Sequence, residues 1–200
     1  MIIKSVFADG YKNLSDVDIR PHERMNIFCG DNAQGKTNLI EAVWLMTGCR
    51  SFRGTRDRDF IGFEKEKASI RLSFQDSFRS QDISFEVRKN NIREKNIALN
   101  GVKVPLLSRL FGSLKCVVFT PEDLFIAKGS PDNRRSFVDL SSSQLKKSFV
   151  YALNKYENLL SQRNALIKKI NFTGRGSADD LDIWDVQLAK TGAYLSLIHI

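Results

Sequence analysis

The sequence predicts an α/β fold: a phosphate-binding-loop lobe with a mixed sheet and an antiparallel subsheet, followed by the start of a helical second domain. The pattern G-x-x-x-x-G-K-[ST] occurs at residues 30–37, between a short apolar run and a helix that ends near Gly48. Apolar residues then alternate with the two-residue period of strands between residues 67 and 104, and recur at helical spacing after residue 143. We therefore expect the lobe at residues 1–128 and the helical domain at residues 129–200, whose last helix has no stop signal.

Short strands are expected before the phosphate-binding loop. Ile2–Phe7 alternates as an opening strand, and Val17–Ile19 suggests a second strand before Pro21. Met25–Phe28 is apolar enough for a buried strand that leads into the loop. The helix after the loop is apolar on too many sides for a surface helix, so we expect it between the sheet and a second layer.

Residues 30–37 have the residue types of a nucleotide phosphate site. Gly30 and Gly35 allow a backbone in which successive N–H groups turn inward around an anion at the start of the following helix. The ammonium of Lys36 suits the β- and γ-phosphates of ATP, and the hydroxyl of Thr37 suits a Mg²⁺ ion. The alternative is a glycine turn before an ordinary helix. The candidate cofactor-binding residues are Gly30, Asp31, Asn32, Ala33, Gln34, Gly35, Lys36 and Thr37, and Thr37 is also the candidate magnesium ligand.

A loop rich in arginine follows this helix. It runs from Arg50 to Asp59 and must lie near the nucleotide because the helix before it is short. Arg53 and Arg56 are therefore candidates for contacts with the phosphates of DNA. A solvated loop without a ligand explains the same residues equally well.

Three alternating runs predict the antiparallel subsheet. They are Lys67–Phe74, Asp82–Arg88 and Asn96–Val104, and the third contains Asn100-Gly101. Asn-Gly favours a two-residue hairpin turn, in which both central residues need positive φ. We expect this subsheet beside the nucleotide-binding fold rather than inside its parallel core.

The next segment predicts a change from strands to helices. Pro105–Phe111 suggests a short helix, and Cys116–Phe119 is a compact apolar run typical of a buried strand. Thr120–Leu124 has the cap hydroxyl, first-turn proline and acidic residues of a helix start. Gly129-Ser130-Pro131 breaks the chain, and Arg134-Arg135 opens a helical segment.

A long amphipathic helix is predicted from Ser143 to Ile170, with basic residues between its apolar positions. Those basic residues fit a stripe that faces DNA, but a solvated helix face explains them better. Gly174-Arg175-Gly176-Ser177 predicts a flexible break, and Leu181–Ile200 starts another helix.

Composition favours a polyanionic partner. The chain has 200 residues, a formal net charge of +8, and ordinary fractions of hydrophobic (42%) and charged (27%) residues. Such a positive charge favours nucleic acid first and an anionic membrane surface second.

The three cysteines, Cys29, Cys49 and Cys116, have no C-x-x-C spacing, so we expect reduced, buried thiols rather than disulfides or a zinc site. With no long apolar run and no signal-peptide pattern, we expect a cytoplasmic protein without a membrane span.

Several short motifs occur in order along residues 1 to about 194. They are Tyr11-Lys12-Asn13-Leu14, Gly30–Asn38 with Glu41-Ala42, Arg50-Ser51-Phe52-Arg53, Phe119–Leu124, Lys128–Pro131 with Arg134-Arg135 and Phe137-Val138-Asp139, Gln162-Arg163-Asn164, and Trp184-Asp185 with Leu188-Ala189 and Gly192-Ala193. Together they resemble the RecF family of recombinational repair ATPases, relatives of the ABC-type ATPase heads of SMC and Rad50 proteins. The phosphate-binding loop alone is shared by many families, whereas the later motifs are more specific.

The resemblance implies ATP-dependent binding of double-stranded and gapped DNA. It implies an ATP-dependent homodimer that works with RecO and RecR to place RecA at single-strand gaps during DNA repair, replication and the SOS response. ATP and Mg²⁺ are the implied cofactors. Arg134 and Arg135 join Arg53 and Arg56 as candidate DNA-binding residues.

The departures from the family indicate the N-terminal part of a longer protein. RecF-like proteins carry in their second half the signature segment, the Walker B acid and the glutamate that positions the attacking water, none of which occurs in this chain. No catalytic residue is therefore assigned, and we expect little or no ATP hydrolysis from this chain but a weak DNA-dependent ATPase activity from the full-length protein. Strands from the second half flank the phosphate-loop strand in such heads, so its edge would be bare here.

Two alternatives remain open. The first is a nucleic-acid-binding module in which the nucleotide is a structural ligand and is not hydrolysed. The second is a head fragment of the Rad50 or SMC kind, which is disfavoured because Ser143–Ile170 is too short for a heptad coiled coil and is followed by Gly174-Arg175-Gly176.

Overall fold

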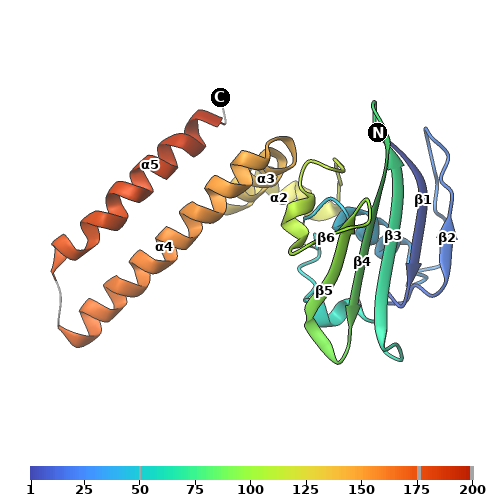
Figure 1. Ribbon diagram of the computed structural model, residues 1–200, viewed down its shortest axis with the longest axis horizontal. Coiled ribbons are helices and arrows are strands. Elements are labelled where there is room, and N and C mark those ends of the chain that lie inside the picture. Colours follow the sequence, from blue (N-terminus) through green and yellow to red (C-terminus); the bar gives the residue numbers. More distant parts are fainter. Residues whose placement is uncertain (50, 175–176, 199–200) are drawn as a thin grey trace. The chain divides into compact units, whose positions relative to one another are not determined.

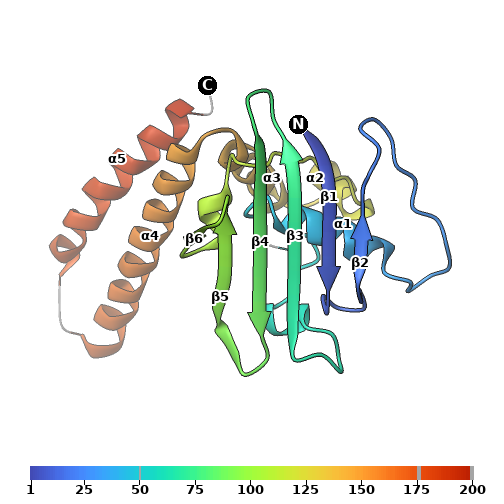
Figure 2. The ribbon, with the colours of Figure 1, turned by 45° about the vertical axis from the view of Figure 1, so that its right-hand side comes forward.

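In the computed structural model, which describes residues 1–49, 51–174 and 177–198, six strands form one antiparallel sheet (Figures 1 and 2). Their spatial order is β2-β1-β3-β4-β5-β6. The bounds are β1 Ile2–Asp9, β2 Val17–Ile19, β3 Lys67–Gln75, β4 Ser80–Arg88, β5 Asn91–Leu99 and β6 Val102–Val104.

One face of this sheet is apolar because the strands alternate. In β3 the residues Ala68, Ile70, Leu72 and Phe74 are all buried, and the residues between them are not. Helix α1 (Lys36–Leu45) contributes to the same hydrophobic core. The short 3₁₀ helices η1 (Asp57–Phe60) and η2 (Leu107–Leu110) each add one buried side chain to it.

The predicted strands between residues 67 and 104 are confirmed, and so is the hairpin turn. Asn100 and Gly101 join β5 to β6 with φ of 52° and 77°, the positive values that the turn requires. The antiparallel sheet also includes the first two strands. Strand β1 pairs directly with β3, from Ile2 opposite Gln75 to Asp9 opposite Ser69.

Two other predicted strands are wrong. Met25–Phe28 and Cys116–Phe119 have no regular secondary structure, because within the described residues neither has a neighbouring strand to share a hydrogen-bond ladder. Their apolar side chains are consequently uncovered: Ile27 is 80% exposed and Val117 is 96% exposed.

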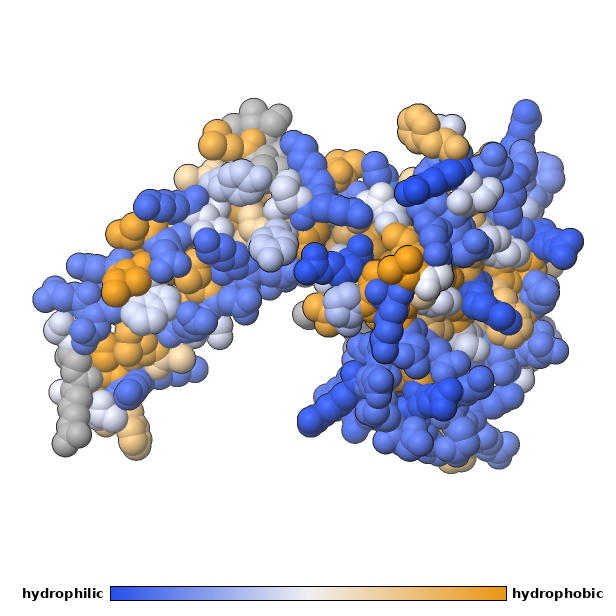
Figure 3. Space-filling model, in the orientation of Figure 1, coloured by the Kyte–Doolittle hydropathy of each residue, from blue (hydrophilic) through white to orange (hydrophobic). Residues whose placement is uncertain are grey.

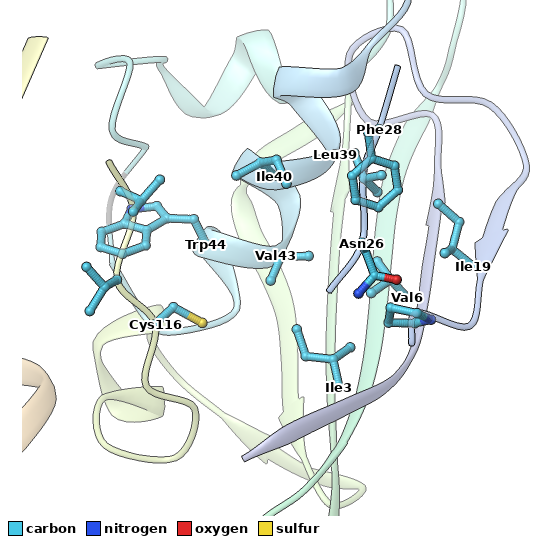
Figure 4. A pocket seen from close by; sticks show the side chains of 13 residues that line it. Ile3, Val6, Ile19, Asn26, Phe28, Leu39, Ile40, Val43, Trp44 and Cys116 are labelled. Carbon is cyan, nitrogen blue, oxygen red and sulfur yellow. The ribbon is translucent and has the colours of Figure 1, made fainter. Parts of the chain in front are cut away.

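These two segments border a groove of about 290 Å³ beside α1 (Figure 4). Its lining is almost entirely apolar and comes from β1, β2, α1 and the two segments. It includes Ile3, Val43, Trp44 and Val118. No residue of the phosphate-binding loop at 30–37 lines it, so this groove is not the nucleotide site.

The chain divides into two compact units, Met1–Thr120 and Pro121–Ile200, whereas the sequence suggested a boundary after residue 128. The second unit is helical, as expected. Its elements are η3 Pro121–Leu124, α2 Phe125–Lys128, α3 Pro131–Leu145, α4 Lys147–Thr173, η4 Ala178–Leu181 and α5 Asp182–Ile198. Arg175 and Gly176, part of the predicted flexible break, lie outside the described residues, as does Arg50.

The predicted long helix begins later than expected. Ser143 still belongs to α3, and Lys146 is extended with φ −134°, so α4 starts at Lys147. Helices α4 and α5 are joined by an ion pair, in which Arg163 Nε donates to Asp185 Oδ1 at 2.5 Å. Hydrophobic side chains appear among hydrophilic ones along the visible face of these two helices (Figure 3). Among the described residues of this unit, the buried apolar side chains are Phe149, Ala152 and Leu159.

Candidate nucleotide-binding site

The segment at residues 30–37 is curled, as the motif predicts. Gly30, Ala33 and Gly35 have φ of 144°, 66° and 95°, and α1 begins directly afterwards at Lys36. A Cβ atom on Gly35 would lie 2.8 Å from Leu14 Cδ2 and 2.9 Å from Asn13 Oδ1, so a larger residue would not fit there. The curled loop therefore ends at a helix N-terminus, the arrangement that favours anion binding.

The side chain of Lys36 folds back over this loop. Its Nζ donates to the carbonyl oxygen of Gly30 at 2.7 Å and to that of Asp31 at 2.6 Å. These two hydrogen bonds hold the positive charge of Lys36 beside the loop. Residues Asp31 to Gln34 of the loop are exposed. The loop therefore combines exposed residues at a helix N-terminus with a nearby cation, an arrangement that suits phosphate binding.

Three polar side chains form a hydrogen-bonded row next to the loop. Asn13 Nδ2 donates to the carbonyl oxygen of Ala33 at 2.6 Å. Asn38 Nδ2 donates to Asn13 Oδ1 at 2.7 Å, and Arg53 Nη1 donates to Asn38 Oδ1 at 3.2 Å. This row, called the amide relay below, connects the arginine-rich loop through α1 to the phosphate-binding loop.

A buried polar network lies behind α1. The fully buried carboxylate of Glu41 accepts hydrogen bonds from Lys12 Nζ, from Ser51 Oγ and, at 3.2 Å, from Thr55 Oγ1. Lys12 Nζ also donates to Thr55 Oγ1 at 3.1 Å. The network thus ties the turn at residue 12 and the loop at residues 51–55 to α1, the helix that begins with Lys36.

Tyr11 lies beside this network in the core. Its hydroxyl has no hydrogen-bond partner among the described residues, and its ring packs against Phe60 with the centroids 5.6 Å apart. Burial, together with the nearby Glu41 carboxylate, raises the pKa of the Tyr11 hydroxyl far above its ordinary value. Tyr11 is therefore neutral at physiological pH and serves as a packing residue.

Thr37 fits a magnesium ligand that acts together with a nucleotide. Its side chain is exposed at the start of α1. Mg²⁺ keeps several waters and takes further oxygens from phosphates, so a single protein hydroxyl is a sufficient contribution. Among the described residues no group of three or more His, Cys, Asp or Glu side chains could hold a metal ion by itself.

The candidate DNA-binding arginines have different surroundings. Arg56 is exposed at the start of η1, whereas Arg53 belongs to the amide relay. In the second unit, Arg134 Nη1 donates to the carbonyl oxygen of Gly129 at 3.1 Å, at the end of α2. Arg135 Nη1 pairs with Asp132 at 2.7 Å. Within the described residues, Arg56 is thus the one of these four arginines whose guanidinium group donates no hydrogen bond to the protein.

The cysteines lie in unlike environments: Cys29 is exposed, Cys49 is buried and Cys116 is half-buried. Burial raises the pKa of Cys49 to about 11 and that of Cys116 to about 11, so both are protonated and weakly nucleophilic at neutral pH. The expectation that all three would be buried is wrong for Cys29, which is exposed because the segment before the loop is not covered.

The sequence patterns do not identify the residues that hold the loop in place. Asn13, Lys12 and Glu41 occur in the motifs above, but those motifs assign them no role. Their spacing along the chain carries no signal, since Lys12 and Glu41 are 29 positions apart and meet through the fold. A charged residue on the apolar helix α1 was the one available signal, because a buried carboxylate requires partners.

Comparisons with known proteins identify relatives of this chain. A family model described as "AAA ATPase domain" matches residues 1–188. The DNA replication and repair protein RecF of Alkaliphilus oremlandii is 37% identical over 195 residues, which are 98% of this chain and 52% of that protein. RecF of Lachnospira eligens is 38% identical over 196 residues, which are 98% of this chain and 53% of that protein.

Two solved structures are also similar. A structure of the recombination mediator protein RecF with ATP, in the RecFOR pathway, matches 99% of this chain and 52% of its own, with a TM-score of 0.90 and 35% identity. A second structure, RecF–ATPrS, matches 98% of this chain and 53% of its own, with a TM-score of 0.87 and 34% identity. These matches confirm the predicted resemblance and the predicted fold class, an ATPase lobe of RecF type with an antiparallel sheet and helices.

This chain matches only part of the length of each relative. The chain spans about half the length of the curated relatives it matches. In the described ranges, no helix combines the length and the apolar character needed to cross a membrane.

Proposed function

Because the chain belongs to the AAA ATPase domain family and is homologous to RecF, we propose that it supplies the phosphate-binding half of an ATP site in a protein that binds double-stranded DNA during repair and replication. The single observation that carries the proposal is the curled loop at residues 30–37 with the Lys36 ammonium held beside it. The similarity to a RecF structure with ATP supports the same nucleotide.

ATP binding in this proposal divides between three groups. The N–H groups of residues 31–35 face the phosphates, Lys36 contributes a positive charge to the β- and γ-phosphates, and Thr37 ligates Mg²⁺. The magnesium ion, when bound, neutralises phosphate charge, and Thr37 provides one oxygen to it.

DNA binding is proposed to depend on backbone phosphates. The net charge of +8 supports it, and all four candidate arginines are exposed. Arg56 is the best placed of them because, within the described residues, its guanidinium group donates no hydrogen bond to the protein. Arg53, Arg134 and Arg135 remain candidates, although each donates to a neighbouring protein oxygen.

The wider role follows from the family. We infer an ATP-dependent homodimer on duplex and gapped DNA that acts with RecO and RecR to load RecA, in the cytoplasm. The uncovered segments Met25–Phe28 and Cys116–Phe119 support a longer parent protein, because the apolar side chains Ile27 and Val117 need a cover. We expect weak DNA-dependent ATPase activity in that protein and little from this chain.

The test is duplex binding by the full-length protein that carries this sequence, measured by fluorescence anisotropy with and without Mg-ATP. We expect ATP to tighten binding, and we expect affinity to fall at least tenfold between about 50 and 200 mM salt, because Lys and Arg contacts release counterions. Arg56→Gln should reduce the slope of log affinity against log salt by about one.

Lys36→Ala provides the matched control in this experiment. It should remove the ATP-dependent part of duplex binding and leave the part seen without nucleotide. Affinity that is insensitive to both salt and ATP would contradict the proposal. Duplex binding with steep salt dependence but no response to ATP would instead favour the alternative of a nucleic-acid-binding module.

A further inference from the structure

The phosphate-binding loop contains a residue whose conformation is unfavourable by itself. Ala33 has φ of 66°, in the left-handed region, which is sterically unfavourable for a residue that carries a Cβ atom. Such a conformation persists only where surrounding contacts impose it. The Ala33 peptide is held by a 2.6 Å hydrogen bond from Asn13 Nδ2 to the Ala33 carbonyl oxygen.

That hydrogen bond also fixes the direction of the next N–H group. In a trans peptide the carbonyl oxygen and the following N–H point in opposite directions. Holding the oxygen of Ala33 toward Asn13 therefore turns the N–H of Gln34 away from Asn13. It also keeps a partially negative carbonyl oxygen from turning toward a bound phosphate.

The orientation of the Asn13 amide is determined by the rest of the relay. A guanidinium group can only donate hydrogen bonds, so Asn38 must present its oxygen to Arg53. Its NH₂ group then faces Asn13 Oδ1, which leaves the Asn13 NH₂ group for Ala33. The donor and the acceptor in each of these three hydrogen bonds are thus determined by Arg53.

The base of the relay is tied to the rest of the fold by hydrogen bonds and an ion pair. The turn that carries Asn13 is closed by a hydrogen bond from Leu14 N to the carbonyl oxygen of Tyr11 at 2.8 Å. Lys12 N donates to the carbonyl oxygen of Phe60 at 2.8 Å, and the Lys12 ammonium is anchored on buried Glu41. Asn13 is consequently held in place before any ligand arrives.

We propose that Asn13 is a positioning residue for the phosphate-binding loop, oriented through Asn38 by Arg53. The inference rests on the proposed function, because it concerns how the loop at residues 30–37 is prepared for a nucleotide. Asn13 acts through the Ala33 peptide and is not assigned a contact with the nucleotide.

The experiment measures Mg-ATP affinity and amide hydrogen exchange in the full-length protein. Asn13→Ala should weaken Mg-ATP binding about tenfold, the scale of one lost hydrogen bond, and should speed exchange in peptides covering residues 31–36 without nucleotide. Asn154→Ala, the same change at an exposed position on α4, should alter neither quantity.

A double-mutant cycle separates positioning from general packing. Asn38→Ala alone should weaken binding about threefold, and it should have no further effect in the Asn13→Ala background, because it acts through Asn13. The melting temperature of each variant shows whether the fold is intact. Additive effects of the two variants, or an Asn13→Ala protein that binds Mg-ATP like the wild type, would overturn the proposal.

The outcomes also separate this inference from the proposed function. If the wild type does not bind Mg-ATP, or if Lys36→Ala binds it normally, the proposed function fails. If the wild type binds Mg-ATP, Lys36→Ala does not, and Asn13→Ala is unchanged, the role of Asn13 alone is wrong.

Discussion

Replacement of Lys36 by alanine is expected to abolish retention of a fluorescent ATP analogue by the full-length protein. The Lys36 ammonium is held at 2.7 Å and 2.6 Å from the carbonyl oxygens of Gly30 and Asp31, which places it beside the loop before the nucleotide binds. A hydrogen bond to a charged group contributes about 1.5–3 kcal/mol, and Lys36 is assigned to two phosphates. We therefore expect at least a hundredfold loss of affinity.

Lys103→Ala is the matched control for this prediction. Lys103 is an exposed lysine on β6 in the same unit, and its replacement should leave retention of the analogue unchanged. If Lys36→Ala retains the analogue like the wild type, the assignment of residues 30–37 to a phosphate site is wrong.

The largest loss of stability is expected from Glu41→Ala. The Glu41 carboxylate is fully buried and accepts from Lys12, Ser51 and Thr55, so its removal leaves three donors, among them the largely buried Lys12 ammonium, without this acceptor. Breaking a buried ion pair by removing one partner costs about 3–5 kcal/mol. Chemical denaturation should therefore show a free energy of unfolding lower by that amount.

Two control variants show whether the loss of stability comes from the burial of the Glu41 ion pair or from the loss of any charged residue. Glu23→Ala breaks the exposed ion pair with Lys4 and should leave the free energy of unfolding nearly unchanged. Lys12→Met should be destabilising in the same way as Glu41→Ala, because it leaves the Glu41 carboxylate buried and unpaired. Wild-type stability in both Glu41→Ala and Lys12→Met would show that the network does not hold α1 in place.

The sequence predicted those parts of the fold that local patterns determine. Alternation located β3 and β4, Asn100-Gly101 located the hairpin, and the glycine-lysine motif located the curled loop before α1. Each of these depends on residues that are close together in the chain, where the side-chain period or the turn chemistry is sufficient.

The sequence was misleading where structure depends on distant partners. Met25–Phe28 and Cys116–Phe119 have strand composition, but a strand forms only beside another, and none of the described residues supplies one. The direct pairing of β1 with β3 was likewise invisible, because nothing local in either strand specifies its neighbour.

The candidate site shows the same division. Lys36 and Thr37 were predicted from one contiguous motif, whereas Asn13 reaches Ala33 from 20 positions earlier in the chain. Such long-range hydrogen bonds follow from the fold and not from the spacing of residues in the sequence.

The most direct measurement of the central claim is amide hydrogen exchange of the full-length protein with and without Mg-ATP. If the backbone N–H groups of residues 31–36 hold the triphosphate, peptides covering them should exchange more slowly with Mg-ATP than without it, and adenosine alone should give no such protection. Equal exchange in this loop with and without saturating Mg-ATP would contradict the account.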